Sequence, residues 1–257
     1  WNPAEIIGLR PKPLALTLYR ELITDGIWAY QRDNYGYRNL RSFPVMVNFF
    51  GLPYIDGRVS FNSFIPKCLK KPLGNKLVDY YLGHLVSKPH LHDKVEFDVI
   101  LSCYTLDIEK RLKIMSSANF SEDELVDIKS NLRLITNRII DPILPIWQKD
   151  VEKIKLLGKR HSKLMESGLQ PIEKLYWVIE NTKRYGTLPF SGLARVGFIA
   201  VQFLRSLVEK GFLSDKDQAN FMLGIKTISS EIRSEKHTLT KKDFLNKFLD
   251  FFHSYSN

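Results

Sequence analysis

The chain has 257 residues, of which 44% are hydrophobic and 26% are charged, as in average globular domains, so the composition excludes a wholly disordered protein. Lys and Arg number 38 against 28 Asp and Glu, a formal charge of +10. This surplus favours an anionic partner, but it does not distinguish nucleic acid from a small anion.

The first third of the sequence predicts short elements separated by prolines. Leucines that recur every four residues after two prolines predict a helix over residues 13–32. A small hairpin is expected from residues 45–50 and 54–61, which are rich in β-branched and aromatic residues, with a turn at Asp56-Gly57. Hydrophobic period predicts a helix over 73–86, and apolar–acidic alternation predicts a third strand over 95–99.

From about residue 105 the sequence predicts helices almost throughout. The capping patterns are Ser121-x-x-Glu124, Ser214-x-x-Asp217 and Thr240-x-x-Asp243. Between them we expect a helix that ends near the Asp141-Pro142 pair, a charged helix to about 167, one over 170–186 and an apolar one over 191–210. The predicted fold is mainly α: a helical bundle with a hairpin or three-stranded element in its N-terminal third. Residues 1–104 form a mixed portion and residues 105–257 a helical portion of what is together one domain.

Several classes of site and location are disfavoured. Familiar phosphate-loop, dinucleotide, nucleophile-elbow and zinc-protease motifs are absent from the sequence. The pair His90 and His92 resembles a metal pair but lacks further ligands, so no metal site is predicted. The two cysteines, Cys68 and Cys103, are expected to be reduced thiols in a cytoplasmic protein. The longest apolar run, 196–204, is too short for the roughly 20 residues of a membrane span.

Arginines beside small and polar residues are the candidate binding groups. Arg10 lies in the N-terminal segment 1–14, which leads into a helix whose exposed amide groups favour an anion. The alternative is that this segment is only a rigid loop at the start of the helix. Arg195 either pairs with a buried carboxylate or offers its guanidinium to a ligand anion. Arg58, Ser60 and Asn62 alternate, so on a strand they share a face, where they contact a polar ligand or a neighbouring loop.

Four motif segments carry a resemblance to a known family. They are the segment 1–14, which begins Trp-Asn-Pro-Ala-Glu, Tyr-Gly-Tyr-Arg at 35–38, the run from Tyr-Ile-Asp to Phe-Asn-Ser-Phe at 54–64, and Gly-Thr-Leu-Pro-Phe to Gly-Leu-Ala-Arg at 186–195. Together they resemble the central region of the phosphoenolpyruvate-synthase-like dikinases. This group includes phosphoenolpyruvate synthase, rifampin phosphotransferase and L-glutamine kinase, and the glutamine-kinase-like branch is the most similar.

The resemblance implies an acceptor-binding domain excised from a larger chain. An ATP-grasp domain, with ATP and Mg²⁺, phosphorylates a histidine on a swivelling domain, and that phosphohistidine visits the acceptor. Both of those domains are implied partners of the same full-length chain, and the fragment alone binds no cofactor and is inactive. A small-molecule acceptor, glutamine among the candidates, is the expected ligand.

On this basis the arginines are expected to clamp phosphoryl charge, while Glu5 and Asn62 orient the acceptor. The Glu5 carboxylate can also act as a base, and the side chains of Tyr37 and Phe190 are expected to line the site. The expected catalytic residues are Glu5, Arg58 and Arg195, and the expected substrate-binding residues are Arg10, Tyr37, Arg38, Asn62, Thr187 and Phe190.

Two other classes of function stay open at this point. The +10 charge suits a nucleic-acid-binding module, although basic residues between 149 and 163 are interleaved with acidic ones and no nucleic-acid motif appears. The chain also suits a helical scaffold that spaces two catalytic domains. Neither nucleic acid nor a membrane is the expected partner.

Overall fold

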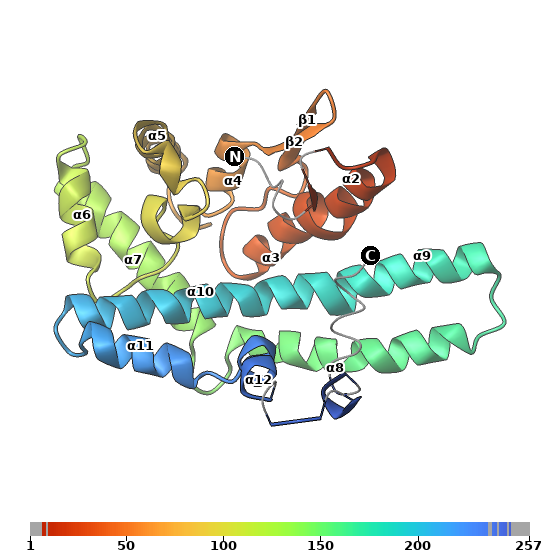
Figure 1. Cartoon of the computed structure of the whole chain (residues 1–257). Helices are drawn as coiled ribbons and strands as arrows, with labels where there is room; N and C mark the ends of the chain where they lie inside the picture. Colours follow the sequence, from red (N-terminus) through yellow and green to blue (C-terminus); the bar gives the residue numbers. More distant parts are fainter. Residues whose placement is uncertain (1–6, 9, 236–237, 241, 246, 248–257) are drawn as a thin grey trace. The chain divides into compact units, whose positions relative to one another are not determined.

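The computed structural model describes residues 7–8, 10–235, 238–240, 242–245 and 247 (Figure 1). The chain divides into two compact units, Trp1–Ser206 and Leu207–Asn257. The structure is mainly helical, at 69%, with 11 helices and one two-stranded antiparallel hairpin in its described part, which confirms the predicted fold class. The expected boundary near residue 104, between a mixed N-terminal portion and a helical C-terminal portion, lies within the first unit.

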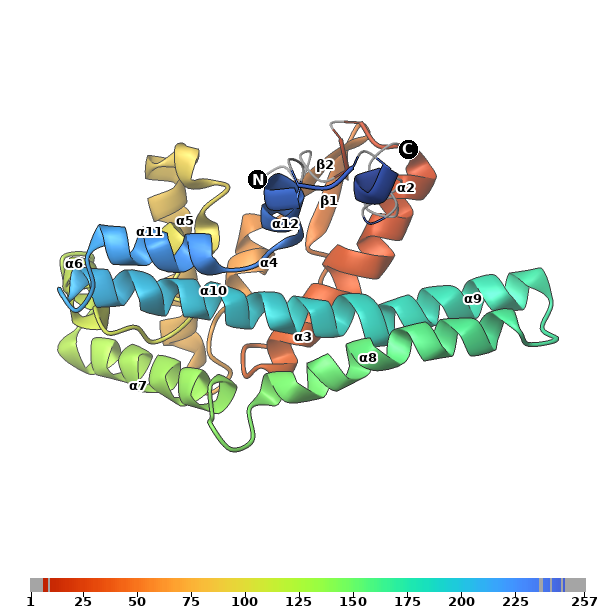
Figure 2. The ribbon, with the colours of Figure 1, turned by 60° about the horizontal axis from the view of Figure 1, so that its bottom comes forward.

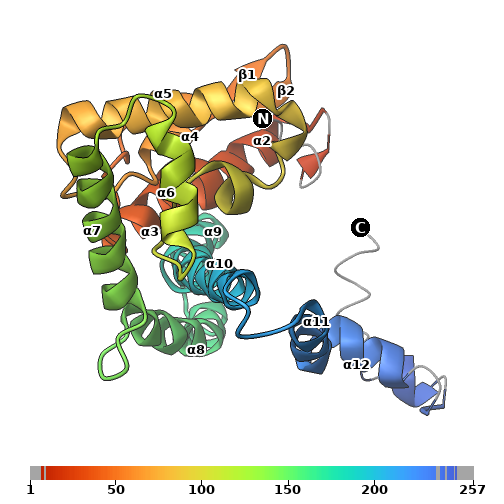
Figure 3. The ribbon, with the colours of Figure 1, turned by 90° about the vertical axis from the view of Figure 1, so that its left-hand side faces the viewer.

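The first unit is built almost entirely from helices. Before residue 105 these are α2 (Pro13–Tyr19), the π-helix η1 (Arg20–Trp28), α3 (Ala29–Asn34), α4 (Gly57–Asn62), α5 (Lys71–Ser87), the 3-10 helix η2 (Pro89–Leu91) and the π-helix η3 (Val95–Val99). After it come α6 (Ile108–Ser116), α7 (Glu122–Ile139), α8 (Ile146–Met165), α9 (Pro171–Asn181), the π-helix η4 (Thr182–Thr187) and α10 (Leu188–Glu209). In Figure 3, α5 and α7 run along two edges of this unit.

The helix predicted over 13–32 is confirmed, because α2, η1 and α3 run on without a break to Asn34. The helix predicted over 73–86 is confirmed as α5. The capping box that begins α7 is also confirmed: Ser121 Oγ accepts from the backbone N–H of Glu124, and the Glu124 carboxylate accepts from the N–H of Ser121.

The hairpin forms as predicted but its second strand is shorter. Strands β1 (Met46–Phe49) and β2 (Leu52–Ile55) pair antiparallel. Phe50 and Gly51, with φ of 52° and 84°, make the two-residue turn that the right-handed strand twist favours. The prediction that this strand continues to residue 61 is wrong. Asp56 instead caps helix α4, because its carboxylate accepts from the Val59 N–H at 3.0 Å.

The third strand predicted over 95–99 is also wrong, since this segment is the π-helix η3. Val95 and Val99, four residues apart, are buried, and Glu96 and Asp98 between them pair with arginines of α10. The alternation of apolar and acidic residues therefore arises from one buried helical edge and two ion pairs rather than from the two faces of a strand.

The expected break between helices near residues 186–191 is not observed. Helices α9, η4 and α10 form one continuous helix of 39 residues, Pro171–Glu209. The π-helical turn η4 precedes Pro189, whose ring and missing N–H disfavour a regular α-helix at that point. Figures 1 and 2 show α9 side by side with α8, as an antiparallel pair that projects beyond the other helices of the first unit.

This continuous helix is the one in the described chain that is long and apolar enough to cross a membrane. Its most apolar 18-residue window has a mean hydropathy of 1.4 and is 28% buried. Core helices of soluble proteins can have the same length and hydropathy. Three polar side chains of this helix, Arg195, Gln202 and Ser206, are buried and contact other parts of the first unit.

Three hydrophobic clusters hold the first unit together. The largest joins α4, α5, η3, α6 and α7, and includes Leu77, Ile100 and Ile128. A second packs Tyr35 and Tyr37 against α7 and α10, and a third packs α2 against the hairpin.

The second unit begins with the last turn of α10 and contains α11 (Asp215–Gly224) and α12 (Ile228–Glu235). The capping box predicted at Ser214 and Asp217 is confirmed at the start of α11. At the third predicted cap, the N–H of Asp243 donates to Thr240 Oγ1. In all three capping patterns, the N–H three residues further along donates to the Ser or Thr hydroxyl oxygen.

Candidate functional site

Three of the four motif segments meet at the C-terminal turn of α4. Asn62, on this turn, accepts a 2.8 Å hydrogen bond from Nη1 of Arg38. The next residue, Ser63, accepts one from Nη1 of Arg32 inside the protein. Phe64 then lies beneath the guanidinium of Arg195, at 4.7 Å from Cζ to the ring centre. Segments that are far apart in sequence therefore form one continuous group of contacts, which we call the arginine site.

The outer part of the arginine site is half open to solvent. Arg38 is half-buried and its guanidinium also reaches Oδ1 of Asn75 and the carbonyl of Lys71, both at 3.4 Å. It lies directly over Gly74, where an added Cβ atom would overlap Nη2 and lie 2.7 Å from Cζ. Burial lowers the pKa of Arg38. The glycine in α5 is thus what allows the guanidinium to lie flat on that helix.

Arg58 lies beside this pair but points to solvent. Its side chain is 60% exposed and forms a 2.8 Å ion pair with Asp79. Asn62 Nδ2 donates to the carbonyl oxygen of Arg58 at 3.0 Å. Because this segment is a helix, Arg58 and Asn62 share a face four residues apart while Ser60 is buried, so the predicted strand face of all three is wrong.

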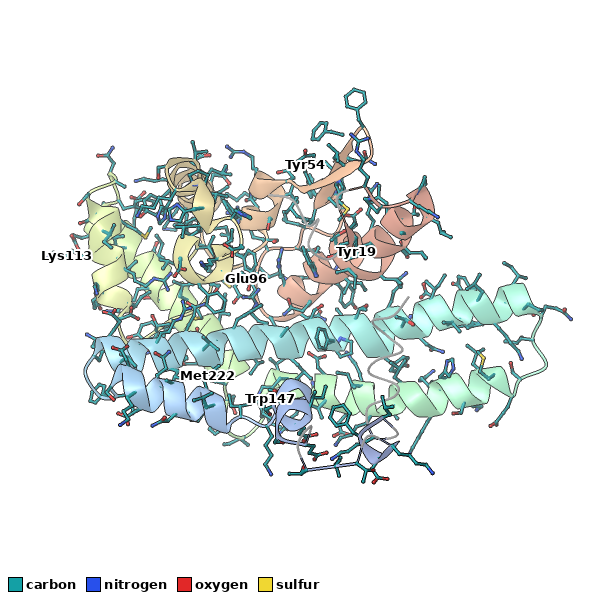
Figure 4. All side chains as sticks on the ribbon, viewed as in Figure 1. Tyr19, Tyr54, Glu96, Lys113, Trp147 and Met222 are labelled. Carbon is teal, nitrogen blue, oxygen red and sulfur yellow. The ribbon has the colours of Figure 1, made fainter. Side chains whose placement is uncertain are left out.

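The inner part of the arginine site is a buried charge cluster. Arg195 Nη1 lies 2.8 Å from Oε2 of Glu96, and Arg32 Nη2 lies 3.9 Å from Oε1 of the same carboxylate. Arg32 is 4% exposed and Arg195 is 3% exposed. Figure 4 labels Glu96, which lies beside α10. Of the two roles that the sequence leaves open for Arg195, the buried ion pair is the one observed, in the middle of the long helix rather than in its first turn.

The two buried arginines differ in their titration. Burial, opposed by Glu96 and reinforced by Arg195, lowers the pKa of Arg32 to about 9. Burial is also the largest effect on Arg195 and acts to lower its pKa, but the Glu96 carboxylate, together with Tyr37 and Cys103, leaves the net pKa raised. The Glu96 carboxylate therefore interacts more strongly with Arg195 than with Arg32.

Tyr37 contributes to the interior rather than to an open wall. It is completely buried, and its hydroxyl group donates to the Ser102 carbonyl oxygen at 2.5 Å. Its ring lies 6.0 Å from Cζ of Arg195 and edge-on to Phe64. Burial raises the pKa of Tyr37, so the phenol stays neutral.

The remaining predicted residues are not brought into the arginine site. Thr187 donates to the carbonyl oxygen of Thr182 within its own helix at 3.5 Å. Phe190 is 67% exposed, and Arg10 is exposed at the start of the described chain. Glu5 lies outside the described residues.

Sequence reasoning misses Arg32, Glu96 and Phe64, which hold the inner part together. The alternating pattern places Glu96 on the wet face of a strand, although an acidic residue next to buried valines is a signal that it pairs with a cation. In the described part of the chain, no three His, Cys, Asp or Glu side chains are grouped as metal ligands. His90 and His92 are exposed, and both cysteines are free thiols.

Comparison of the chain with protein-family models, with curated proteins and with solved structures gives no match. Guanidinium groups bind carboxylate and phosphate oxygens, and the outer arginines Arg38 and Arg58 have the exposure that such a contact requires. Asn62 adds an amide between them.

Proposed function

We propose that this chain is the acceptor-binding domain of an ATP-dependent dikinase, in which a small polar acceptor receives a phosphoryl group from a phosphohistidine on a separate domain. The observation that supports this proposal is the contact between three of the four motif segments that resemble the dikinases. Arg38, Asn62 and Arg195 come from different segments, yet all belong to the arginine site.

In this proposal the outer arginines bind and orient. Arg38 and Arg58 neutralise the negative oxygens of the incoming phosphoryl group, and Asn62 holds the acceptor by its amide. The transfer breaks the N–P bond, whose electron pair stays on the imidazole ring. The acceptor atom forms the new bond to phosphorus and releases its proton to solvent. Tyr37 and the inner charge cluster fix the backbone beneath these groups.

The other parts of the proposed enzyme lie in other domains. ATP and Mg²⁺ bind to the nucleotide-binding domain that the resemblance implies, and the phosphorylated histidine belongs to the swivelling domain. A cytoplasmic enzyme of this kind needs both domains as partners, and the chain alone binds the acceptor without turnover.

The test uses this chain joined to those two domains, with AMP formation from ATP measured in the presence of amides, pyruvate and alcohols. We expect one acceptor class to stimulate AMP release and Arg38→Met to reduce that stimulation about tenfold, a loss typical of one charge-assisted contact. Lys113→Met, on the exposed face of α6 outside the arginine site, is the matched control and should stay within about twofold. The proposal would be contradicted if no acceptor stimulated AMP release and if titration of the isolated chain with the same acceptors showed no binding.

A further inference from the structure

The inner part of the arginine site carries an unbalanced charge. Two guanidinium groups, Arg32 and Arg195, share the single carboxylate of Glu96. The side chains of the two arginines are 5% and 4% exposed, so water screens neither of them well. The rings of Phe64 and Phe198, which face the arginines at 3.9 to 5.7 Å, attract cations but do not neutralise them. The cluster therefore has one positive charge in excess.

Hydrogen bonds in the cluster are also incomplete. Nε and Nη1 of Arg195 and Oε2 of Glu96 are buried and have no hydrogen-bond partner among the described residues. The 2.8 Å contact between Arg195 and Glu96 is an ion pair whose angles are too poor for a hydrogen bond. Arg32 is farther from the same carboxylate, at 3.9 Å. The Glu96 carboxylate is thus the counter-charge of both guanidinium groups, and it forms a well-aligned hydrogen bond with neither.

A buried cation without an opposite charge is costly, and an N–H group left without an acceptor adds to this cost. An additional anion relieves both, because it balances the excess charge and supplies acceptors for Arg195. The lowered pKa of Arg32 agrees with a cluster in which Glu96 alone gives that guanidinium too little compensation. Glu96 is the most exposed member of the cluster, since its side chain is 20% exposed while both arginines are covered.

We propose that Arg32, Arg195 and Glu96 form a binding site for a small anion with a single negative charge, either a free ion or the carboxylate group of a larger ligand. The anion enters beside Glu96 and joins it between the two guanidinium groups, which brings the cluster to neutrality. This inference rests on the contacts of the cluster and does not depend on the proposed function.

The test measures thermal unfolding of the 257-residue chain at constant ionic strength, with formate or chloride replacing the weakly coordinating anion methanesulfonate. We expect formate or chloride to raise the melting temperature by about 2–4 °C at saturating concentration, because they bind only the folded state. Glu96→Gln removes the competing carboxylate. That variant should melt lower in methanesulfonate but bind formate about tenfold more tightly than the original chain.

Asp98→Asn is the matched control, because Asp98 lies in the same π-helix and pairs with the exposed Arg205. It should respond to formate as the unchanged chain does. The proposal is overturned if neither anion exceeds methanesulfonate in the unchanged chain, a result that decides the matter even where Glu96→Gln fails to fold. An equal response of Arg195→Met and the unchanged chain also overturns it. Since no ATP or acceptor enters this experiment, its outcome is separate from that of the dikinase test.

Discussion

The hydroxyl group of Tyr35 donates a 2.7 Å hydrogen bond to Oδ2 of Asp150, 115 residues further along the chain. This bond joins the end of α3 to the beginning of α8, where the α8–α9 pair starts. Gly192 of α10 packs against both residues, so that a Cβ atom there would overlap the carboxylate of Asp150 and lie 2.5 Å from the Tyr35 hydroxyl oxygen. Three helices thus meet at one buried polar contact.

Gly192→Ala should lower the free energy of unfolding by about 1–3 kcal/mol, because the new methyl group has to displace a buried hydrogen-bonded pair. Gly197→Ala is the control in the same helix. No atom lies within 4 Å of its added Cβ, so the change should raise stability by about 0.5–1 kcal/mol through helix propensity. Urea unfolding of both variants checks the difference, and equal effects would contradict this packing.

Asp150 should make the stability of the protein depend on pH. Burial raises the pKa of this carboxyl group, despite the hydrogen bond from Tyr35 and the nearby Lys153. Its protonated form is therefore favoured in the folded state, so its contribution to stability is fully present below the unfolded-state pKa and is lost as pH rises through the folded-state value. Relative to Asp150→Asn, the unchanged chain should gain stability as pH falls from about 7 to about 4.5. Urea unfolding at a series of pH values measures this gap, and a gap that stays constant would show that Asp150 titrates normally.

Gly74→Ala should disturb the outer arginine site while leaving the fold intact, because the added methyl group displaces the guanidinium of Arg38 rather than backbone. Acceptor-stimulated AMP release by the multidomain enzyme should fall about tenfold, as for loss of a charge-assisted contact. Gly83→Ala, in the same helix with no atom within 4 Å of its Cβ, is expected to keep full activity. Identical activities in the two variants would show that Arg38 does not contribute to the acceptor-stimulated reaction.

Leu132→Ala should cost about 2–5 kcal/mol, because Leu132 is completely buried in the largest cluster. Leu134, two residues along α7, is 62% exposed, and Leu134→Ala should change stability by less than about 0.5 kcal/mol. Chemical denaturation of the pair tests whether the amphipathic face of α7 is placed correctly. A large loss of stability in the Leu134→Ala variant would indicate that the face of α7 that carries Leu134 is buried rather than exposed.

Local patterns predict the helices of this chain well and its strands poorly. The capping boxes and the apolar period of α7 involve residues only a few positions apart, so the local sequence contains both partners. Residues 95–99 contain an alternation that fits a strand, but Glu96 is fixed by Arg32 and Arg195, which are distant in sequence. Asp56 resembles a hairpin-turn residue and is a helix cap, because the actual turn lies earlier, at Phe50 and Gly51.

The candidate site is predicted in part for the same reason. The motif segments identify Arg38, Arg58, Asn62 and Arg195, but not which of them are exposed and which are buried. That distinction depends on Gly74 in α5 and Phe64 after α4, whose contacts form only when the first unit folds. Helices also continue where local signals favour a stop, as at Pro189, because the π-helical turn before it accommodates the ring.

The unbroken helix Pro171–Glu209 has a mechanical consequence. At 1.5 Å per residue it extends over about 58 Å, with the free end of the α8–α9 pair at one side and Arg195 well along its length. The tip of the α8–α9 pair and Arg195 belong to one unbroken helix, so a load on that tip reaches Arg195 through the π-helical turn η4 rather than through a loop.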